Sequence, residues 1–391
     1  MKKDLLGPAL LPVLALCLSA AVGAAGCGDS PEVKAPPPPA IVEPPPATTP
    51  PPPVTPPPAE PTAEEKKKAE QLKQLSEDRA KAEAEHKKEV ERWTPELKTE
   101  AKALVEKAFP NGKAAIQGAM ASKTRQPGRA DRDKFRHPAE TLDFFGFKPT
   151  LTVLEFGPGE GWYTELLAPT LAKKGKLLAT ITDPNGPADQ RSTYYGQIFK
   201  MFLDTSPELY GKVETVTIDG KAPKLPQDGT VDLVVLAREM HGMVNNGKLE
   251  AWLAEFHKAL KPNGLLGVEQ HRAKADAKAE ESAKNGYLPE KWVIEKVEAA
   301  GFKLAGKSEI NANAKDTKDY PKGVWTLPPS LNEGDKDREK YMAIGESDRM
   351  TLKFTKVAKP APKTDKPAAA TPPAKPAAPV TPAAPVPPKK P

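Results

Sequence analysis

The amino-acid sequence predicts an α/β protein with a doubly wound, mainly parallel sheet. Short runs of apolar and β-branched residues alternate along the chain with longer amphipathic segments. The strand-like runs are apolar almost throughout, which is typical of strands that helices cover on both faces. Sheets of this kind bind ligands at the carboxyl ends of their strands, so we expect functional residues there.

The elements of this fold follow one another within a predicted domain at 94–356. Its first helix begins at Pro95, which stands in the first helical position after Thr94. Further helices are predicted at 162–171, 194–203, 249–260 and 289–300. Strands are predicted at 152–156, 176–181, 212–218, 231–237, 265–270, 303–310 and 350–356.

Segments of different composition flank this domain. Residues 28–61 are rich in proline and predict a disordered stalk. Residues 357–391, rich in Ala, Pro and Lys, predict a disordered, solvated tail, with contact to the cell wall or another acidic polymer as the alternative. Residues 62–93 form a charged segment with a capping box at Thr62 and Glu65. Its apolar stripe is thin, so we expect a solvated spacer helix, with a coiled-coil partner surface as the alternative.

The first 27 residues have the layout of a signal peptide. Two lysines precede an apolar run, and small residues follow it up to Cys27. The sequence 24–27, Ala-Ala-Gly-Cys, resembles the bacterial lipobox, in which the cysteine is acylated and becomes the new N-terminus. We therefore expect an exported lipoprotein that is anchored to a membrane at Cys27 and faces the periplasm or cell envelope. Plain cleavage and an uncleaved anchor are the alternatives.

Composition excludes several classes of function. The 58 Lys and Arg residues are nearly balanced by 52 Asp and Glu, so the sequence offers little support for a nucleic-acid partner. Cys17 and Cys27 both belong to the predicted signal segment, which leaves no thiol for catalysis or zinc binding. The five histidines lack metal-ligand spacing and no G-x-S-x-G motif is present, so we expect neither a metal site nor a serine hydrolase.

A glycine-rich loop follows the first predicted strand. The sequence 155–161 is Glu-Phe-Gly-Pro-Gly-Glu-Gly, and its glycines at 157, 159 and 161 allow a tight turn that a ligand can approach closely. A dinucleotide fingerprint would require glycine at position 162, which is Trp162. The spacing therefore favours a different nucleotide-like ligand, although such a loop is also compatible with a plain turn.

Two aspartates and a turn occupy corresponding places further along the chain. Asp183 follows the second predicted strand, Asp219 follows the third, and the sequence 260–264, Leu-Lys-Pro-Asn-Gly, precedes the fifth. A carboxylate at a strand end can accept hydrogen bonds from ribose hydroxyls or an adenine amino group. The alternative for each aspartate is a structural turn.

Taken together, these features resemble the class I methyltransferases, whose first loop reads E/D-x-G-x-G-x-G. The resemblance implies a Rossmann-like, seven-stranded sheet and S-adenosylmethionine as the cofactor. It places Glu155 and the three glycines of the loop at the cofactor, Asp183 at its ribose and Asp219 at its adenine.

Several segments also resemble a family of bacterial predicted methyltransferases, many of them exported. These include His-Pro-Ala-Glu-Thr-Leu at 137–142, Gly-Trp-Tyr-Thr-Glu at 161–165, Gly-Val-Trp-Thr-Leu-Pro-Pro at 323–329 and Gly-Glu-Ser-Asp-Arg-Met at 345–350. The similarity extends from about residue 125 to residue 356. It implies the fold and the cofactor but names no methyl acceptor.

Candidate residues for the acceptor site lie near the ends of the fourth and fifth strands. His241 and His271 are the candidate general bases, each with a structural role as the alternative. Arg272 and Arg349 are candidates for clamping an acidic acceptor, with surface ion pairing as the alternative. The remaining candidates are Tyr163, Glu239, Asn311 and Asn313, of which the asparagines can instead stabilise an irregular turn.

The export signal and the expected cofactor conflict, because S-adenosylmethionine is made inside cells. A second hypothesis is therefore a non-catalytic envelope lipoprotein that retains the fold, and a third is another nucleotide-using α/β enzyme. The intact glycines and aspartates favour the methyltransferase over a decayed site.

Overall fold

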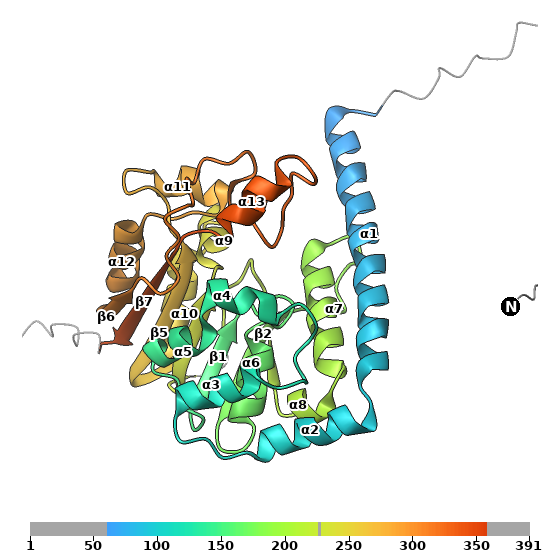
Figure 1. Cartoon of the computed structure of the whole chain (residues 1–391). Helices are drawn as coiled ribbons and strands as arrows, with labels where there is room; N and C mark the ends of the chain where they lie inside the picture. Colours follow the sequence, from blue (N-terminus) through green and yellow to red (C-terminus); the bar gives the residue numbers. More distant parts are fainter. Residues whose placement is uncertain (1–60, 226–227, 358–391) are drawn as a thin grey trace, which may run out of the picture. The chain divides into compact units, whose positions relative to one another are not determined.

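The computed structural model describes residues 61–225 and 228–357 (Figure 1). These residues contain a seven-stranded sheet with the order β3-β2-β1-β4-β5-β7-β6. The strands are β1 (Thr152–Phe156), β2 (Lys176–Thr182), β3 (Glu214–Ile218), β4 (Val231–Ala237), β5 (Leu260–His271), β6 (Phe302–Ser308) and β7 (Arg349–Lys356). β1 to β5 are parallel, and β7 lies antiparallel between β5 and β6. The predicted doubly wound, mainly parallel sheet is confirmed.

The direction of winding changes at β1. The chain runs outward from β1 through β2 to β3 and then returns to place β4 on the other side of β1. The carboxyl ends of β1 and β4 therefore border the point at which ligands enter such sheets. β5 differs most from its prediction: it begins at Leu260, which pairs with Val231, and a register irregularity separates this first pair from the rest. The bounds of β2, β3, β6 and β7 shift by one or two residues.

Helices precede, connect and follow the strands. The longer ones are α1 (Ala63–Arg92), α2 (Pro95–Glu106), α3 (Gly112–Met120), α5 (Pro138–Phe145), α6 (Thr164–Leu171), α7 (Arg191–Asp204), α10 (Leu249–Ala259) and α12 (Glu290–Ala299). Short helices are α4 (Asp133–Arg136), α8 (Pro207–Tyr210), α9 (Met240–Asn245), α11 (Ala279–Ser282) and α13 (Arg338–Ile344), with 3-10 turns η1 (Ala130–Arg132), η2 (Ala283–Asn285) and η3 (Gly323–Thr326). The helices predicted from periodicity are all present, with ends that shift by a few residues.

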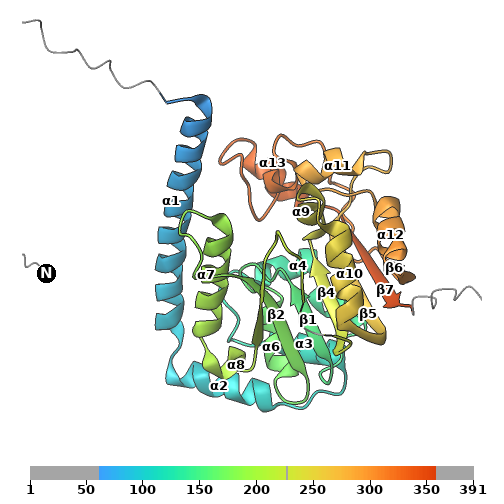
Figure 2. The ribbon, with the colours of Figure 1, turned by 180° about the vertical axis from the view of Figure 1, so that it is seen from behind.

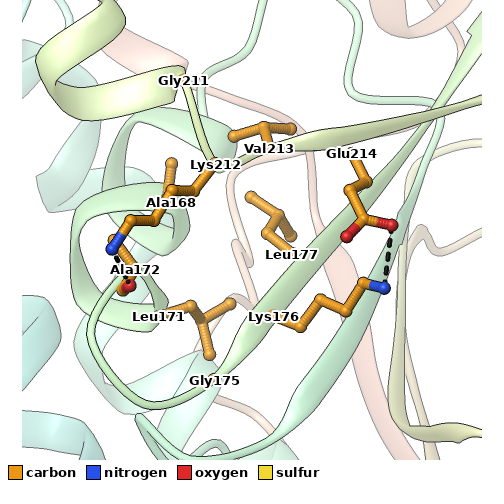
Figure 3. Close-up of a pocket in the computed structure, with 10 residues that line it drawn as sticks. All are labelled: Ala168, Leu171, Ala172, Gly175, Lys176, Leu177, Gly211, Lys212, Val213 and Glu214. Carbon is orange, nitrogen blue, oxygen red and sulfur yellow. Dashed lines mark hydrogen bonds and ion pairs between the residues drawn. The ribbon is translucent and has the colours of Figure 1, made fainter.

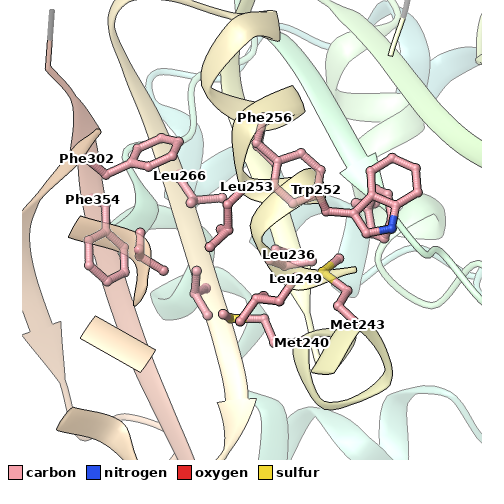
Figure 4. Packing of buried hydrophobic residues seen from close by; sticks show 14 of the residues in the cluster. Leu236, Met240, Met243, Leu249, Trp252, Leu253, Phe256, Leu266, Phe302 and Phe354 are labelled. Atoms are coloured by element: carbon pink, nitrogen blue, oxygen red, sulfur yellow. The ribbon is translucent and has the colours of Figure 1, made fainter. Parts of the chain in front are cut away.

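Helices cover both faces of the sheet (Figures 1 and 2). Two large hydrophobic clusters lie between these helices and the strands. On one face α10 packs Trp252, Leu253 and Phe256 against β4 and β5 (Figure 4). The rings of Phe156 and Trp252 meet there in a T-shaped contact. On the other face α3, α5 and α6 cover the same strands. Because both faces of the central strands are buried, most successive residues of β1, β2 and β4 are apolar, which explains the pattern in the sequence.

Helix α1 has the predicted bounds and capping box but lies against the domain (Figures 1 and 2). Leu75 is 5% exposed and packs with Tyr194 and Ile198 of α7. Asp78 forms an ion pair with Arg191, and its carbonyl oxygen accepts a hydrogen bond from the Tyr194 hydroxyl at 3.4 Å. The structure differs here from the predicted solvated spacer helix, because the thin apolar stripe of α1 packs against α7.

Several sequence predictions lie outside the described residues. These are the signal segment with Cys27, most of the stalk, and the tail from residue 358. Among residues 61–225 and 228–357, no helix combines the length and the apolar character that crossing a bilayer demands.

Replacing Leu75 with alanine should release α1 from α7. Removing the one buried leucine of this contact costs about 2 kcal/mol, so the amides of α1 should exchange with solvent several-fold faster by hydrogen exchange, while those of β1 and β4 keep their protection. Leu72→Ala is the matched control, because Leu72 is 38% exposed on the same helix. Unchanged exchange in the Leu75 variant would contradict the docking.

Candidate active site at the carboxyl ends of the strands

The glycine loop connects β1 to α6 with a left-handed backbone at all three glycines. The φ angles of Gly157, Gly159 and Gly161 are +64°, +58° and +80°, values that side chains disfavour. A Cβ at Gly157 would come within 2.5 Å of the Glu239 side chain, and one at Gly161 within 2.4 Å of Phe202. A Cβ at Gly159 would meet no atom within 4 Å. The middle of the loop thus faces open space, while its two ends are packed.

Glu155, the acidic residue that begins the motif, is buried beneath the loop. Its carboxylate accepts a hydrogen bond from the Thr164 hydroxyl at 2.7 Å, which ties β1 to the start of α6. Burial raises the pKa of Glu155 to about 7 despite that hydrogen bond. The side chain is 3% exposed, so it supports the loop from below.

Asp183 and Asp219 directly follow β2 and β3 on the same edge of the sheet. Both side chains are exposed. The Asp183 carboxylate accepts a hydrogen bond from the Asn185 amide at 2.9 Å, and the Asp219 carboxylate accepts one from the Lys221 amide at 2.8 Å. These are the turns that the sequence offered as alternatives. The other carboxylate oxygen of each has no partner among the described residues, so the ribose and adenine roles stay predictions.

Arg129 lies beside the loop, and the sequence analysis did not select it. One terminal nitrogen, Nη2, donates to the carbonyl oxygen of Glu160 at 2.5 Å, and the guanidinium stacks 4.9 Å from the centre of the Phe202 ring. The other, Nη1, is buried and has no hydrogen-bond partner within the described part of the chain. A buried guanidinium nitrogen without an acceptor is costly, which points to an anionic group beside the loop.

The end of β5 carries a fully buried carboxylate, Glu269. It accepts a hydrogen bond from the Tyr163 hydroxyl at 2.8 Å and pairs with Arg238 at 3.2 Å and Arg349 at 3.0 Å. Burial opposes ionisation, but the two arginines hold the pKa of Glu269 below its usual value. Tyr163 and Arg349 were predicted for the acceptor site, but both belong to this buried network, and their side chains are only 3% and 1% exposed.

A second buried carboxylate, Glu346, completes this network. Arg136 pairs with it at 2.9 Å, Arg132 at 3.2 Å and Arg349 at 2.5 Å. Burial opposes ionisation here too, but these positive charges lower the pKa of Glu346 to about 2. The pairs join α4 and η1, which precede the sheet, to the residues before β7.

Both candidate histidines are partly buried, and their surroundings favour the neutral form of each ring. Burial lowers the pKa of His241 to about 4, and it lowers the pKa of His271 well below the ordinary value, with the neighbouring His241 adding to the effect. Their rings lie 5.8 Å apart, and Trp325 packs edge-on against His241 at 5.7 Å. His271 is hydrogen-bonded to Ser347 at 2.5 Å. The structure thus brings them together in an aromatic cluster.

The remaining candidates of the acceptor site are occupied within the fold. Arg272 forms ion pairs with Glu290, Glu309 and Asp348 at 2.6 to 3.0 Å. The Asn311 amide donates to the hydroxyls of Thr141 and Thr351, and that of Asn313 donates to the carbonyl oxygens of Ile344 and Glu346. These contacts correspond to the alternatives of ion pairing and turn stabilisation.

Glu239 stands apart from these paired groups. Its side chain lies directly against Gly157, and its carboxylate accepts no hydrogen bond from any described residue. Burial raises the pKa of Glu239 to about 7, although the neighbouring Arg238 opposes the shift. A carboxyl group that titrates near neutral pH can take up a proton during a reaction.

The opposite edge of the sheet holds a pocket of 410 Å³ between α6, β2 and β3 (Figure 3). Its rim carries an exposed ion pair of Lys176 with Glu214 at 2.8 Å. A second pocket, of 530 Å³, is lined by residues of α3, α5 and α6 at their connections. Neither pocket is lined by the glycine loop. No cluster of residues able to hold a metal ion occurs between residues 61 and 357, the masked pair 226–227 aside.

Comparisons with known proteins agree with this architecture. Residues 129–302 match the family described as "Methyltransferase domain", and no curated protein matches the chain. The structure is similar to a SAM-dependent methyltransferase from Aquifex aeolicus, with 19% identity, a TM-score of 0.40 and coverage of 64% of this chain and 100% of that one. It is also similar to a TehB-like SAM-dependent methyltransferase from Corynebacterium glutamicum, with 18% identity, a TM-score of 0.34 and coverage of 56% and 87%. Residues 129–302 of the chain thus resemble a methyltransferase domain, within a doubly wound, mainly parallel sheet.

Replacing Glu346 with glutamine should destabilise the protein, because Arg136 and Arg349 would lose a buried counter-charge. We expect a loss of about 3–5 kcal/mol at pH 7, measured by urea unfolding. The folded-state pKa lies below the unfolded value, so this stabilisation is complete above about pH 5 and falls as the pH drops toward 2. The difference between wild type and variant should shrink accordingly.

The exposed pair provides the control for this substitution. Glu214→Gln removes a carboxylate whose side chain is 57% exposed, and surface pairs contribute about 0–1 kcal/mol. Equal losses in the two variants, or a Glu346 effect that is independent of pH, would refute the buried network as a source of stability.

Proposed function

We propose that this protein transfers a methyl group from S-adenosylmethionine to an acceptor at the carboxyl ends of β1 and β4. The observation that carries the proposal is the loop geometry: the backbone is left-handed at three alternate glycines, and only the middle one, Gly159, faces open space. The match of residues 129–302 to a methyltransferase domain supports it independently.

The residues around the loop fit this cofactor. Open space at Gly159 allows the cofactor to approach the backbone, and the unpaired Nη1 of Arg129 is a donor suited to the methionine carboxylate. Asp183 and Asp219 lie on the same edge with one free carboxylate oxygen each, which suits ribose and adenine recognition. Together these donors and acceptors support the proposal of S-adenosylmethionine as the ligand.

The cofactor, when bound, supplies a methyl group on a sulfonium. The chain has to hold the acceptor in line and, for an O–H or N–H nucleophile, to remove its proton as the new bond to carbon forms. Glu239 is the group best placed for that proton, because it lies against Gly157 and its pKa is about 7. His241 and His271 are weaker bases in this environment, since burial lowers the pKa of each.

We also propose that the enzyme acts in the cell envelope as a lipoprotein anchored through Cys27. The support is the sequence of the first 27 residues and the proline-rich segment after them. Labelling cells with a radioactive fatty acid tests this: label incorporated into the full chain but lost in Cys27→Ser supports the anchor, and equal labelling of both rejects it.

Replacing Gly159 with valine should abolish binding of S-adenosylhomocysteine to the full chain, as measured by calorimetry. The side chain would project into the open space over the loop, so we expect affinity to fall more than a hundredfold from the micromolar range. Gly229→Val is the matched control: its φ is +62°, it too faces open space, and it lies at the amino end of β4.

Backbone strain is common to both variants, so only the ligand site distinguishes them. Wild-type protein that is folded but fails to bind the ligand, or equal losses in both variants, would overturn the proposed cofactor site.

Replacing Glu239 with glutamine should stabilise the protein at pH 8 but not at pH 5. The folded-state pKa of about 7 lies above the unfolded value, so the folded state bears an unfavourable charge that grows as the pH rises through 7. We expect a gain of about 1–3 kcal/mol at pH 8 in guanidinium unfolding. A gain of equal size at pH 5, or none at pH 8, would contradict the raised pKa.

A further inference from the structure

Arg238 occupies a strained position at the end of β4. Its φ is +63°, in the left-handed region that residues with a side chain disfavour. The backbone is held there by a hydrogen bond of 2.7 Å from the Arg238 amide to the Glu269 carbonyl oxygen. Strain of this kind is concentrated at functional sites, where it aims a side chain.

The Arg238 guanidinium is only partly used within the protein. Its Nη1 is shared between the two oxygens of Glu269, at 3.2 Å from each. Its Nε and Nη2 donate to no residue of the described chain, and 21% of the side chain is exposed. Two donors of a nearly buried cation are therefore available to a ligand.

Arg132 presents the same arrangement from η1. Its Nε donates to Glu346 at 3.2 Å, its terminal nitrogens have no partner among the described residues, and its side chain is 26% exposed. Burial lowers the pKa of Arg132, and the positive charge of Arg238 lowers it further. The two arginines therefore act on the same region of the site.

Positive charge exceeds negative charge in this network. Four guanidinium groups, of Arg132, Arg136, Arg238 and Arg349, surround two ionised carboxylates. Burial lowers the pKa of Arg136 to about 9, and the positive charges of Arg238, Arg132 and Arg349 add to the shift, while Glu346 opposes it. An anion bound there would relieve this repulsion.

We propose that the methyl acceptor carries a carboxylate or phosphate group that the free donors of Arg238 and Arg132 hold beside the glycine loop. This rests on the proposed function. A planar guanidinium binds either anion through two parallel hydrogen bonds, so it orients the acceptor as well as holding it. Because β4 neighbours β1, an acceptor anchored at Arg238 lies next to Gly157 and Glu239.

The cofactor has a carboxylate of its own, which is a second source of the same chemistry. Arg129 provides a separate place for it, since its unpaired Nη1 lies on the loop itself, beside Glu160. If Arg238 binds the acceptor, its loss should leave cofactor affinity unchanged, whereas if Arg238 binds the cofactor carboxylate, its loss should weaken cofactor binding.

The test is calorimetric titration of inorganic phosphate into the full chain, with and without saturating S-adenosylhomocysteine, at constant ionic strength. Wild-type protein should bind phosphate in the millimolar range with the second ligand present. Arg238→Gln should weaken phosphate binding at least tenfold and leave affinity for S-adenosylhomocysteine within twofold. Arg92→Gln is the matched control, because Arg92 is 23% exposed and paired with a single glutamate, Glu89.

If circular dichroism shows that Arg238→Gln does not fold, Arg132→Gln serves as the second variant, because Arg136 and Arg349 still pair with Glu346 in it. Arg132→Gln should weaken phosphate binding several-fold. No phosphate binding by wild type, or equal losses in the Arg92 variant, would overturn the proposal.

A tenfold loss of S-adenosylhomocysteine affinity in Arg238→Gln would assign the site to the cofactor instead. If wild type fails to bind S-adenosylhomocysteine, the proposed function fails, while phosphate binding that Arg238→Gln abolishes still establishes the anion site.

Discussion

The buried pairing of Glu269 and Glu346 with four arginines is the constraint on which the carboxyl edge of the sheet depends. Arg136 and Glu346 are 210 residues apart in sequence, yet their side chains meet at 2.9 Å with both nearly inaccessible to water. Arg349 bridges the two carboxylates, so the network joins segments before β1, after β4 and before β7. Buried pairs contribute little over a well-packed apolar core, but loss of one partner is costly. The network therefore fixes how these segments meet more than it adds to overall stability.

The same burial divides four glutamates into two functional kinds. Glu269 and Glu346 have arginine partners, so their pKa values are lowered and they remain charged. Glu155 and Glu239 flank the glycine loop without a paired arginine, so desolvation dominates and raises the pKa of each to about 7. The fold thus places carboxyl groups that can change protonation state at the loop, and fixed charges behind them.

The sequence was sufficient for the fold because each element carried its own local signature. Continuous apolar strands, amphipathic helices and the alternate glycines predicted the sheet and the loop, and the structure confirms them. Prediction of the site was limited to residues next to strand ends, such as Glu239 and His241. Arg129, Arg238 and Glu346 were missed because their roles arise from pairing across long stretches of chain, which no local pattern reveals. One signal was available: Glu269 is a charged residue inside an apolar strand, and such a residue requires a buried partner.

The two edges of the sheet differ in how strongly their charged groups could bind the proposed anion. At the amino edge, the ion pair of Lys176 with Glu214 is about half exposed, so water screens the charges and a ligand would gain little from them (Figure 3). At the carboxyl edge, Arg238 and Arg132 are held in a low-dielectric setting in which each charge acts more strongly. Their positions are fixed by Glu269 and Glu346 before any ligand arrives, so little ordering remains to be done on binding. An acceptor with the proposed anionic group would therefore meet preorganised donors at the edge where the glycine loop also lies.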